Sequence, residues 1–209
     1  MDGWAARSFR TASPSWTPDG KGFYYTWLPT DPKIPTAERP GYSEIRYHEI
    51  GTDPKKDPVI HEKLGDPKKF LGVGLSRDGR WLFVYKWNGW TSVEITYKDL
   101  QKKWKTFKPF FSSDTSQAYV LAWKNQFYIA TNEGAPRWQV YKTPVNKPAR
   151  KQWKVLVPEP EKDVIDSVKI IGNHLVLSNL RNATSAIEIR DLKDGKLVRE
   201  VELPGVGAS

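Results

Sequence analysis

The stretch "SRDGRWLFVY" at residues 76–85 decides the fold class, because an Asp-Gly pair stands directly before a run of apolar and aromatic residues. Asp-Gly pairs favour tight hairpin turns, and apolar residues in such a run are typical of β-strands. The same order of turn and strand recurs in "TPDGKGFYYT" (17–26), "LAWKNQFYIAT" (121–131) and "KIIGNHLVLSN" (169–179). One hairpin signal that occurs four times predicts an internal repeat.

The distances between these turns indicate the size of the repeated unit. The markers Asp19, Asp78, Asn125 and Asn173 follow one another after 59, 47 and 48 residues. A Pro-rich insertion at 28–42 accounts for the longer first interval. Four short strands fit into each unit, and four strands in a unit of this length are typical of β-propeller blades.

We therefore predict an all-β fold, a β-propeller built from four four-stranded antiparallel blades. In this prediction residues 1–209 form a single propeller-type domain without a hydrolase domain. Its blades are expected at approximately 8–64, 69–112, 116–160 and 164–204. A β-sandwich is the rival fold, but sixteen evenly repeated strands exceed what a sandwich of this length uses.

The composition excludes several kinds of site and partner. The absence of Cys rules out disulfides, thiolate nucleophiles and Cys-based zinc sites. The net charge is +9, but the lysines are scattered through turns, so we interpret them as a solvated surface and expect no nucleic-acid partner. The segment "KKWKTFKPFF" at 102–111 is the strongest basic patch, and it also has the pattern of an edge strand guarded by Lys.

The sequence shows no targeting signal and no membrane segment. "MDGWAARSFR" at 1–10 lacks the basic and then apolar layout of a signal peptide, and no apolar run is long enough for a membrane helix. We expect a soluble protein with no membrane partner. The absence of Cys is compatible with either redox compartment, so the compartment stays open.

No constellation of residues predicts catalysis, a metal or a cofactor. The three histidines, His48, His61 and His174, have no metal-type spacing, and we interpret them as surface or packed side chains. The acidic loop "PEPEKD" at 158–163 is expected to be solvated rather than to supply a general acid or base. We therefore predict no catalytic residues, no metal and no cofactor.

Aromatic residues predict a possible binding surface on one rim, the end of the blades where strand two connects to strand three. Trp87 and Trp90 in "KWNGWTS" fall at this connection, and Arg137 and Trp138 lie at the equivalent place in the next blade. Trp is favoured where partners bind. The alternative is that these side chains fill the space between neighbouring blades.

Several segments, in order along the chain, resemble the propeller of the prolyl oligopeptidase family, with the closest likeness to bacterial members. They are "SPSWTPDGKGFYYTWLPTD", "ERPGYSEIRYHEIGTDPKKDPVIHE", "LSRDGRWLFVY", "YIATNEGAPRWQVYKTPV", "KDVIDSVKIIGNHLVL" and "DLKDGKLVREVELPGVGAS". The resemblance runs over about residues 12–209 and implies a seven-blade propeller that caps an α/β-hydrolase domain. In that family the propeller restricts access to a Ser-Asp-His triad that cleaves short peptides after proline.

The resemblance transfers no catalytic residue to this chain. Nothing here fits the G-x-S-x-G pattern around a nucleophilic Ser, and about four of the seven blades are represented. The segments 1–10 and 87–113 also differ from the sequence motifs that the family has at these places. We therefore expect a non-catalytic fragment, engineered or redesigned and recombinant; by resemblance, the parent would come from the bacterial cytoplasm or periplasm.

Four blades in a row leave two outer sheet faces without a neighbour, which predicts that something covers them. We expect a homodimer that closes as an eight-blade ring, because its angle between blades is close to that of seven blades. A closed four-blade ring and an open arc remain alternatives. The expected function is a structural, self-assembling scaffold. The alternative is an engineered module that holds a peptide or protein partner on the rim or in the channel.

Overall fold

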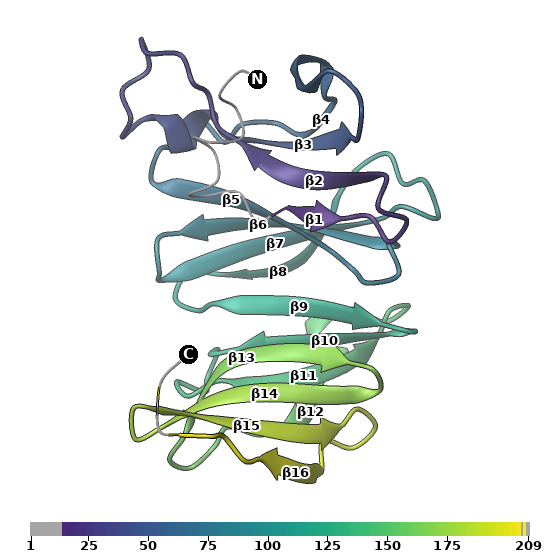
Figure 1. Ribbon diagram of the computed structural model, residues 1–209, viewed down its shortest axis with the longest axis vertical. Helices are drawn as coiled ribbons and strands as arrows, with labels where there is room; N and C mark the ends of the chain where they lie inside the picture. The colour runs from purple at the N-terminus through teal and green to yellow at the C-terminus, as the bar shows by residue number, and fades with distance from the viewer. Residues whose placement is uncertain (1–13, 206, 208–209) are drawn as a thin grey trace. The chain divides into compact units, whose positions relative to one another are not determined.

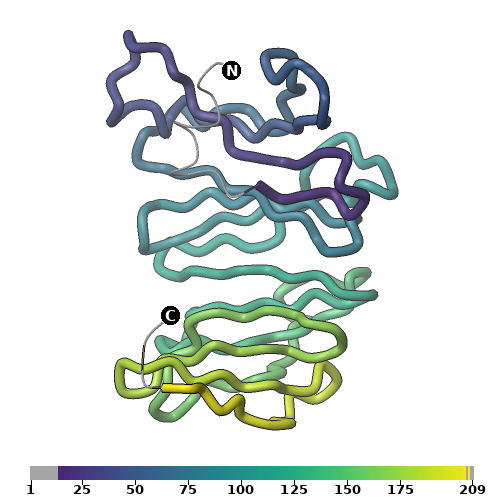
Figure 2. The backbone as a smooth tube through the Cα atoms, viewed as in Figure 1, coloured from purple at the N-terminus to yellow at the C-terminus, as the bar shows by residue number. Residues whose placement is uncertain are grey.

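The computed structural model describes residues 14–205 and residue 207, which form sixteen strands in four four-stranded antiparallel sheets (Figure 1). In every sheet the spatial order of the strands is their order along the chain, so each strand pairs with the next one (Figure 2). The predicted all-β fold with four four-stranded antiparallel sheets is therefore confirmed. The chain divides into two compact units, Met1–Thr115 and Ser116–Ser209, with two sheets in each.

The first unit contains two sheets and two short 3-10 helices. Its strands are β1 (Ser15–Trp16), β2 (Gly22–Trp27), β3 (Glu44–Glu49) and β4 (Val59–His61) in one sheet, and β5 (Lys69–Leu75), β6 (Trp81–Asn88), β7 (Ser92–Asp99) and β8 (Lys108–Ser113) in the other. The helices are η1 (Arg39–Tyr42) and η2 (Pro54–Lys56). The predicted first blade begins at about residue 8, and its part before residue 14 lies outside the described residues.

The turn between β5 and β6 is built as the opening motif predicts. The Asp78 carboxylate accepts hydrogen bonds from the Ser76 hydroxyl and from the backbone N–H of Arg80. Gly79 follows with a φ of 70°, in the left-handed region that costs glycine little. The local chemistry of this turn thus reverses the chain before the apolar run of β6 begins.

The two sheets of the first unit pack through apolar side chains and two hydrogen bonds to β5. Ile45 of β3, Leu71 of β5 and Val84 of β6 are buried in one cluster. The Ser15 hydroxyl donates to the Val73 carbonyl oxygen at 3.1 Å, and the Thr26 hydroxyl donates to the Leu71 carbonyl oxygen at 3.2 Å. Strand β5 therefore lies against the face of the first sheet that carries Ile45 (Figure 1).

The second unit repeats this arrangement with longer strands. One sheet contains β9 (Ala118–Trp123), β10 (Gln126–Thr131), β11 (Gln139–Pro144) and β12 (Lys154–Val157), and the other contains β13 (Val164–Ile171), β14 (His174–Arg181), β15 (Thr184–Asp191) and β16 (Leu197–Val201). The helix η3 (Arg150–Gln152) precedes β12.

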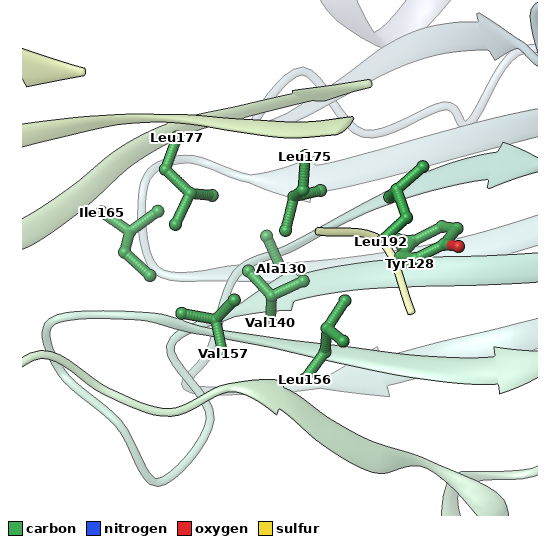
Figure 3. Packing of buried hydrophobic residues seen from close by; sticks show 9 residues of the cluster. All are labelled: Tyr128, Ala130, Val140, Leu156, Val157, Ile165, Leu175, Leu177 and Leu192. Atoms are coloured by element: carbon green, nitrogen blue, oxygen red, sulfur yellow. The ribbon is translucent and has the colours of Figure 1, made fainter. Parts of the chain in front are cut away.

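A contiguous apolar core joins the two sheets of the second unit (Figure 3). Its buried members are Tyr128, Ala130, Val140, Leu156, Val157, Ile165, Leu175, Leu177 and Leu192. Side chains alternate between the two faces of a strand. Leu175 and Leu177 therefore lie on the face of β14 that packs against the sheet of β9 to β12. Burying such side chains supplies about 1.5–3 kcal/mol each, which holds the two sheets face to face.

Helix contributes very little to this structure. The helical segments among the described residues are 3-10 turns of three or four residues, and none of them has the length and hydropathy of a membrane span. The Pro-rich insertion predicted at 28–42 leads into η1 and forms no additional strand.

Candidate functional site

The two tryptophans of the predicted rim have different environments in the first unit. Trp87 belongs to β6, and its ring stacks on Tyr85 at a centroid distance of 5.2 Å and an interplanar angle of 6°. Trp90 lies in the turn between β6 and β7 and is 96% exposed. Trp87 is thus committed to packing within its sheet, whereas Trp90 presents its ring to solvent.

The Trp87 ring also covers a glycine on the neighbouring strand. A Cβ atom placed on Gly72 of β5 would lie 2.2 Å from Cζ3 of Trp87. The absence of a side chain at residue 72 therefore makes room for the ring. This contact gives the Trp87 ring a packing role within its own sheet.

Arg137 lies in the connection between β10 and β11 and ties it to the loop between the two sheets of the second unit. Its backbone N–H donates to the Glu159 carboxylate at 2.8 Å, and its Nε donates to the Pro160 carbonyl oxygen at 2.7 Å. Its own carbonyl oxygen accepts from the backbone N–H of Ile165 at 3.1 Å. The acidic loop at 158–163 was expected to be solvated. Its Glu159 carboxylate instead holds the β10–β11 connection in place through this hydrogen bond.

Trp138 follows Arg137 and packs inside the same unit. Its ring stacks on Tyr119 at 5.5 Å with an interplanar angle of 18°, and it lies against the apolar core. Its φ of 68° is unusual for a residue with a bulky side chain, and it turns the chain into β11. Of the four predicted rim residues, Trp90 is the most exposed. A binding role for the set stays a prediction.

The histidines occupy three separate environments. His48 is buried, with Nδ1 3.0 Å from Oδ1 of Asp57, and the Tyr25 hydroxyl donates to Oδ2 of the same carboxylate at 2.7 Å. Burial and this hydrogen bond raise the pKa of Tyr25, so the phenol stays protonated. The three side chains form one buried hydrogen-bonded group, and buried polar groups are normally hydrogen-bonded.

The other two histidines lie outside this hydrogen-bonded group. The pKa of His61 is lowered, chiefly by burial, and its Nδ1 lies 2.7 Å from the Glu62 carbonyl oxygen. His174 is exposed at the start of β14. Within the part of the chain that the structure describes, no three metal-ligating side chains gather at one place.

A groove in the second unit was not predicted from the sequence. It has a volume of about 490 Å³ and opens where the β9–β10 and β11–β12 connections meet the β13–β14 and β15–β16 turns. Four lysines line it, and we call it the lysine groove: Lys124, Lys142, Lys154 and Lys193. No signal in the sequence pointed to it, because Lys142 lies on the same face of β11 as the buried Val140, whereas Lys124 and Lys193 lie in turns.

Residues 4–209 match the family described as "Prolyl oligopeptidase, N-terminal beta-propeller domain". The chain belongs to this family. The prolyl oligopeptidase propeller resemblance predicted from the sequence motifs is therefore confirmed, and the four sheets correspond to part of such a propeller.

Relatives of this propeller domain are prolyl peptidases of bacteria and fungi. The prolyl endopeptidase of Elizabethkingia miricola is 26% identical over 197 residues, which are 93% of this chain and 27% of that protein. The prolyl oligopeptidase A of Amanita bisporigera is 26% identical over 209 residues and is covered to 27%. The chain thus spans about a quarter of the length of these relatives.

Solved structures show the same propeller fold. A structure from a study of two prolyl endopeptidases superposes with a TM-score of 0.88 at 50% identity, over 95% of this chain and 29% of that one. Prolyl oligopeptidase B from Galerina marginata superposes with a TM-score of 0.79 at 20% identity, over 94% of this chain and 28% of that one. The part of these proteins that the chain matches is the N-terminal propeller, not the peptidase domain.

Proposed function

We propose that this propeller segment is non-catalytic and acts as a structural scaffold, resembling the part of prolyl oligopeptidases that restricts access of substrates. The observation that carries the proposal is the match of residues 4–209 to the propeller domain alone. The way the polar groups are used supports it, because His48, Asp57 and Glu159 all serve packing or loop attachment. That the chain is an engineered or redesigned piece of a longer protein remains part of this proposal.

Two apolar sheet faces support self-assembly as the scaffold's mode of action. In the second unit, Val176 pairs with Ile189 on the face of β14 opposite Leu175 and Leu177, and Ile171 is 59% exposed there. Opposite residues of an antiparallel pair share a face. This face therefore lacks the apolar cover that the face bearing Leu175 and Leu177 receives.

The first unit offers a second face that exposes aromatic surface, although Tyr25 and His48 on the same face are buried. Trp16 of β1 is 53% exposed and contacts Phe23 of β2 with centroids 4.9 Å apart. Both side chains lie on the face opposite Ile45, which packs towards β5. We propose that these two faces meet between two copies, which closes eight blades under two-fold symmetry.

The mass in solution tests self-assembly. Light scattering is expected to give twice the chain mass of 24.0 kDa, and Ile189→Lys should return it to the monomer. The matched control is Ile50→Lys, which changes an exposed isoleucine in the turn after β3. A stable monomer of the unchanged chain would contradict the dimer.

A peptidase assay tests the non-catalytic part of the proposal separately. The chain is expected to release no chromophore from a proline-containing chromogenic peptide, under conditions in which a full-length prolyl endopeptidase does. Turnover that co-purifies with this chain through two different columns would overturn the proposal.

A binding module is the second candidate function, and the exposure of Trp90 favours it. An exposed Trp in a turn can stack on the rings and prolines of a peptide. Calorimetric titration with short proline-containing peptides would show binding that Trp90→Ala abolishes and that Tyr42→Ala, at another exposed aromatic, preserves. The absence of heat with the unchanged chain would exclude this role for such peptides.

A further inference from the structure

The apolar core of the second unit gives way to a strongly basic groove at one end. Tyr128 and Leu192 lie next to each other at that end of the core (Figure 3), and both also line the lysine groove. The register places Lys142 opposite both Tyr128 and Lys154, so these side chains share the face that packs on the second sheet. The groove is therefore the continuation of the core face with lysines in place of apolar residues.

Side chains from one sheet reach the turns of the other across this groove. The Lys124 ammonium donates to the side-chain oxygen of Asn173 at 3.1 Å, and the Lys142 ammonium donates to the carbonyl oxygen of Lys193. An ammonium group carries three N–H donors, so these bonds position the two amines and leave donors for a further acceptor. Fixed donors of this kind bind a ligand at a smaller entropic cost than mobile side chains.

The positive charges in the lining of the groove outnumber the negative ones. Among the described residues, no carboxylate forms an ion pair with any of the four lysines. Asp191 is the one acidic residue in the lining, and its carboxylate accepts the backbone N–H of Lys193 at 2.6 Å. The lining thus has a formal excess of three positive charges, which a bound anion would neutralise.

We propose that the lysine groove binds a small polyanion, whose charge comes from phosphate or from carboxylate groups. The volume of about 490 Å³ lies within the range of about 300–1,000 Å³ that is typical of small-molecule sites. Two or more oxyanion groups on one molecule would contact lysines from both sheets at once. Such a ligand also bridges the two sheets and stabilises the unit by binding only its folded state.

Calorimetric titration of the full chain at low salt tests the site with two probes, pyrophosphate and citrate. Replacing all four lysines of the groove by Gln is expected to weaken binding by at least about 10-fold. The matched control replaces four exposed lysines of the first unit by Gln, which removes the same charge: Lys55, Lys56, Lys102 and Lys105. This control should retain affinity within about 2-fold.

Two milder variants test the site if replacing all four lysines prevents folding. Lys124→Gln with Lys193→Gln alters exposed turn residues only, and Asp191→Asn removes the acidic residue while keeping an acceptor for the Lys193 N–H. The double change should weaken binding and Asp191→Asn should tighten it, each by about 3-fold or more.

The results with the two probes identify the kind of anion that binds, or show that none does. Binding of pyrophosphate alone assigns a phosphate ligand, binding of citrate alone assigns a carboxylate ligand, and binding of both assigns a general polyanion site. No heat with either probe at about 10 mM would overturn the proposal, as would equal weakening by the control variant in the first unit.

Discussion

The indole ring of Trp87 occupies the space that a side chain on Gly72 would need. The two residues belong to paired strands, and an added Cβ atom at residue 72 would come 2.2 Å from Cζ3 of the ring. Tyr85, which pairs with Gly72, stacks on the Trp87 ring. An aromatic pair and a glycine thus form one packing unit on the sheet of β5 and β6.

Gly72→Ala should therefore destabilise the first unit by about 1–3 kcal/mol, because the Trp87 ring must leave its stacked position. Gly74→Ala is the matched control, since its Cβ atom would meet Tyr85 at an ordinary contact distance of 3.4 Å. Urea unfolding followed by fluorescence measures both. Equal stability of the two variants would show that the ring moves aside without cost.

Trp87→Ala and Trp90→Ala should affect stability very differently. The first removes a ring that stacks on Tyr85 and is expected to cost about 2 kcal/mol. The second removes a ring that is 96% exposed and should change the free energy of unfolding by less than about 0.5 kcal/mol. A large loss on Trp90→Ala, seen in thermal or urea unfolding, would show that this turn contacts another part of the protein or a second copy.

Asp99→Asn should make the free energy of unfolding of the first unit less dependent on pH in the acidic range. Asp99 is fully buried, accepts hydrogen bonds from Arg80 at 2.9 and 3.2 Å, and accepts two more from the backbone N–H groups of residues 101 and 102. Burial alone would raise its pKa, but the bonds from Arg80 and the backbone hold the pKa below the ordinary value of 3.8. The variant should lose about 2 kcal/mol or more at neutral pH.

The sign of the pH effect follows from this lowered pKa. The stabilisation by Asp99 is complete above pH 3.8 and is lost as the pH falls through the lower pKa of the folded state. The gap between the unchanged chain and Asp99→Asn should consequently shrink below that pH in urea unfolding. Glu161→Gln, in an exposed loop position, serves as the control, and a gap that stays constant down to pH 2 would contradict the assignment.

Leu177→Ala should destabilise the second unit far more than Leu180→Ala, although both residues lie on β14. Leu177 is buried between the two sheets, whereas Leu180 is 41% exposed on the same strand. We expect a loss of about 2–4 kcal/mol for the first change and less than about 1 kcal/mol for the second. Similar losses in calorimetric unfolding would show that the outer face of this sheet is covered in solution.

The sheets could be predicted from the sequence because each hairpin is determined by neighbouring residues. Asp78 and Gly79 form their turn through bonds to residues within three positions, and the alternation after them sets the two faces of β6. The family could be predicted for a related reason, since the motifs that carry it occur in order along the chain. The ends of strands are harder to predict, as in β11, which begins at Gln139 after Trp138 has turned the chain with a positive φ.

The candidate sites depended on contacts between segments that are distant in the sequence. Nothing in the order of residues tells that the Trp87 ring covers Gly72, or that Asp57 joins His48 and Tyr25. The sequence by itself determined the repeated hairpins, their apolar faces and the family, because turn chemistry and alternation are local properties. Only the tertiary structure decided which rings are exposed and that four scattered lysines share a groove, because burial and proximity arise when one sheet packs on another.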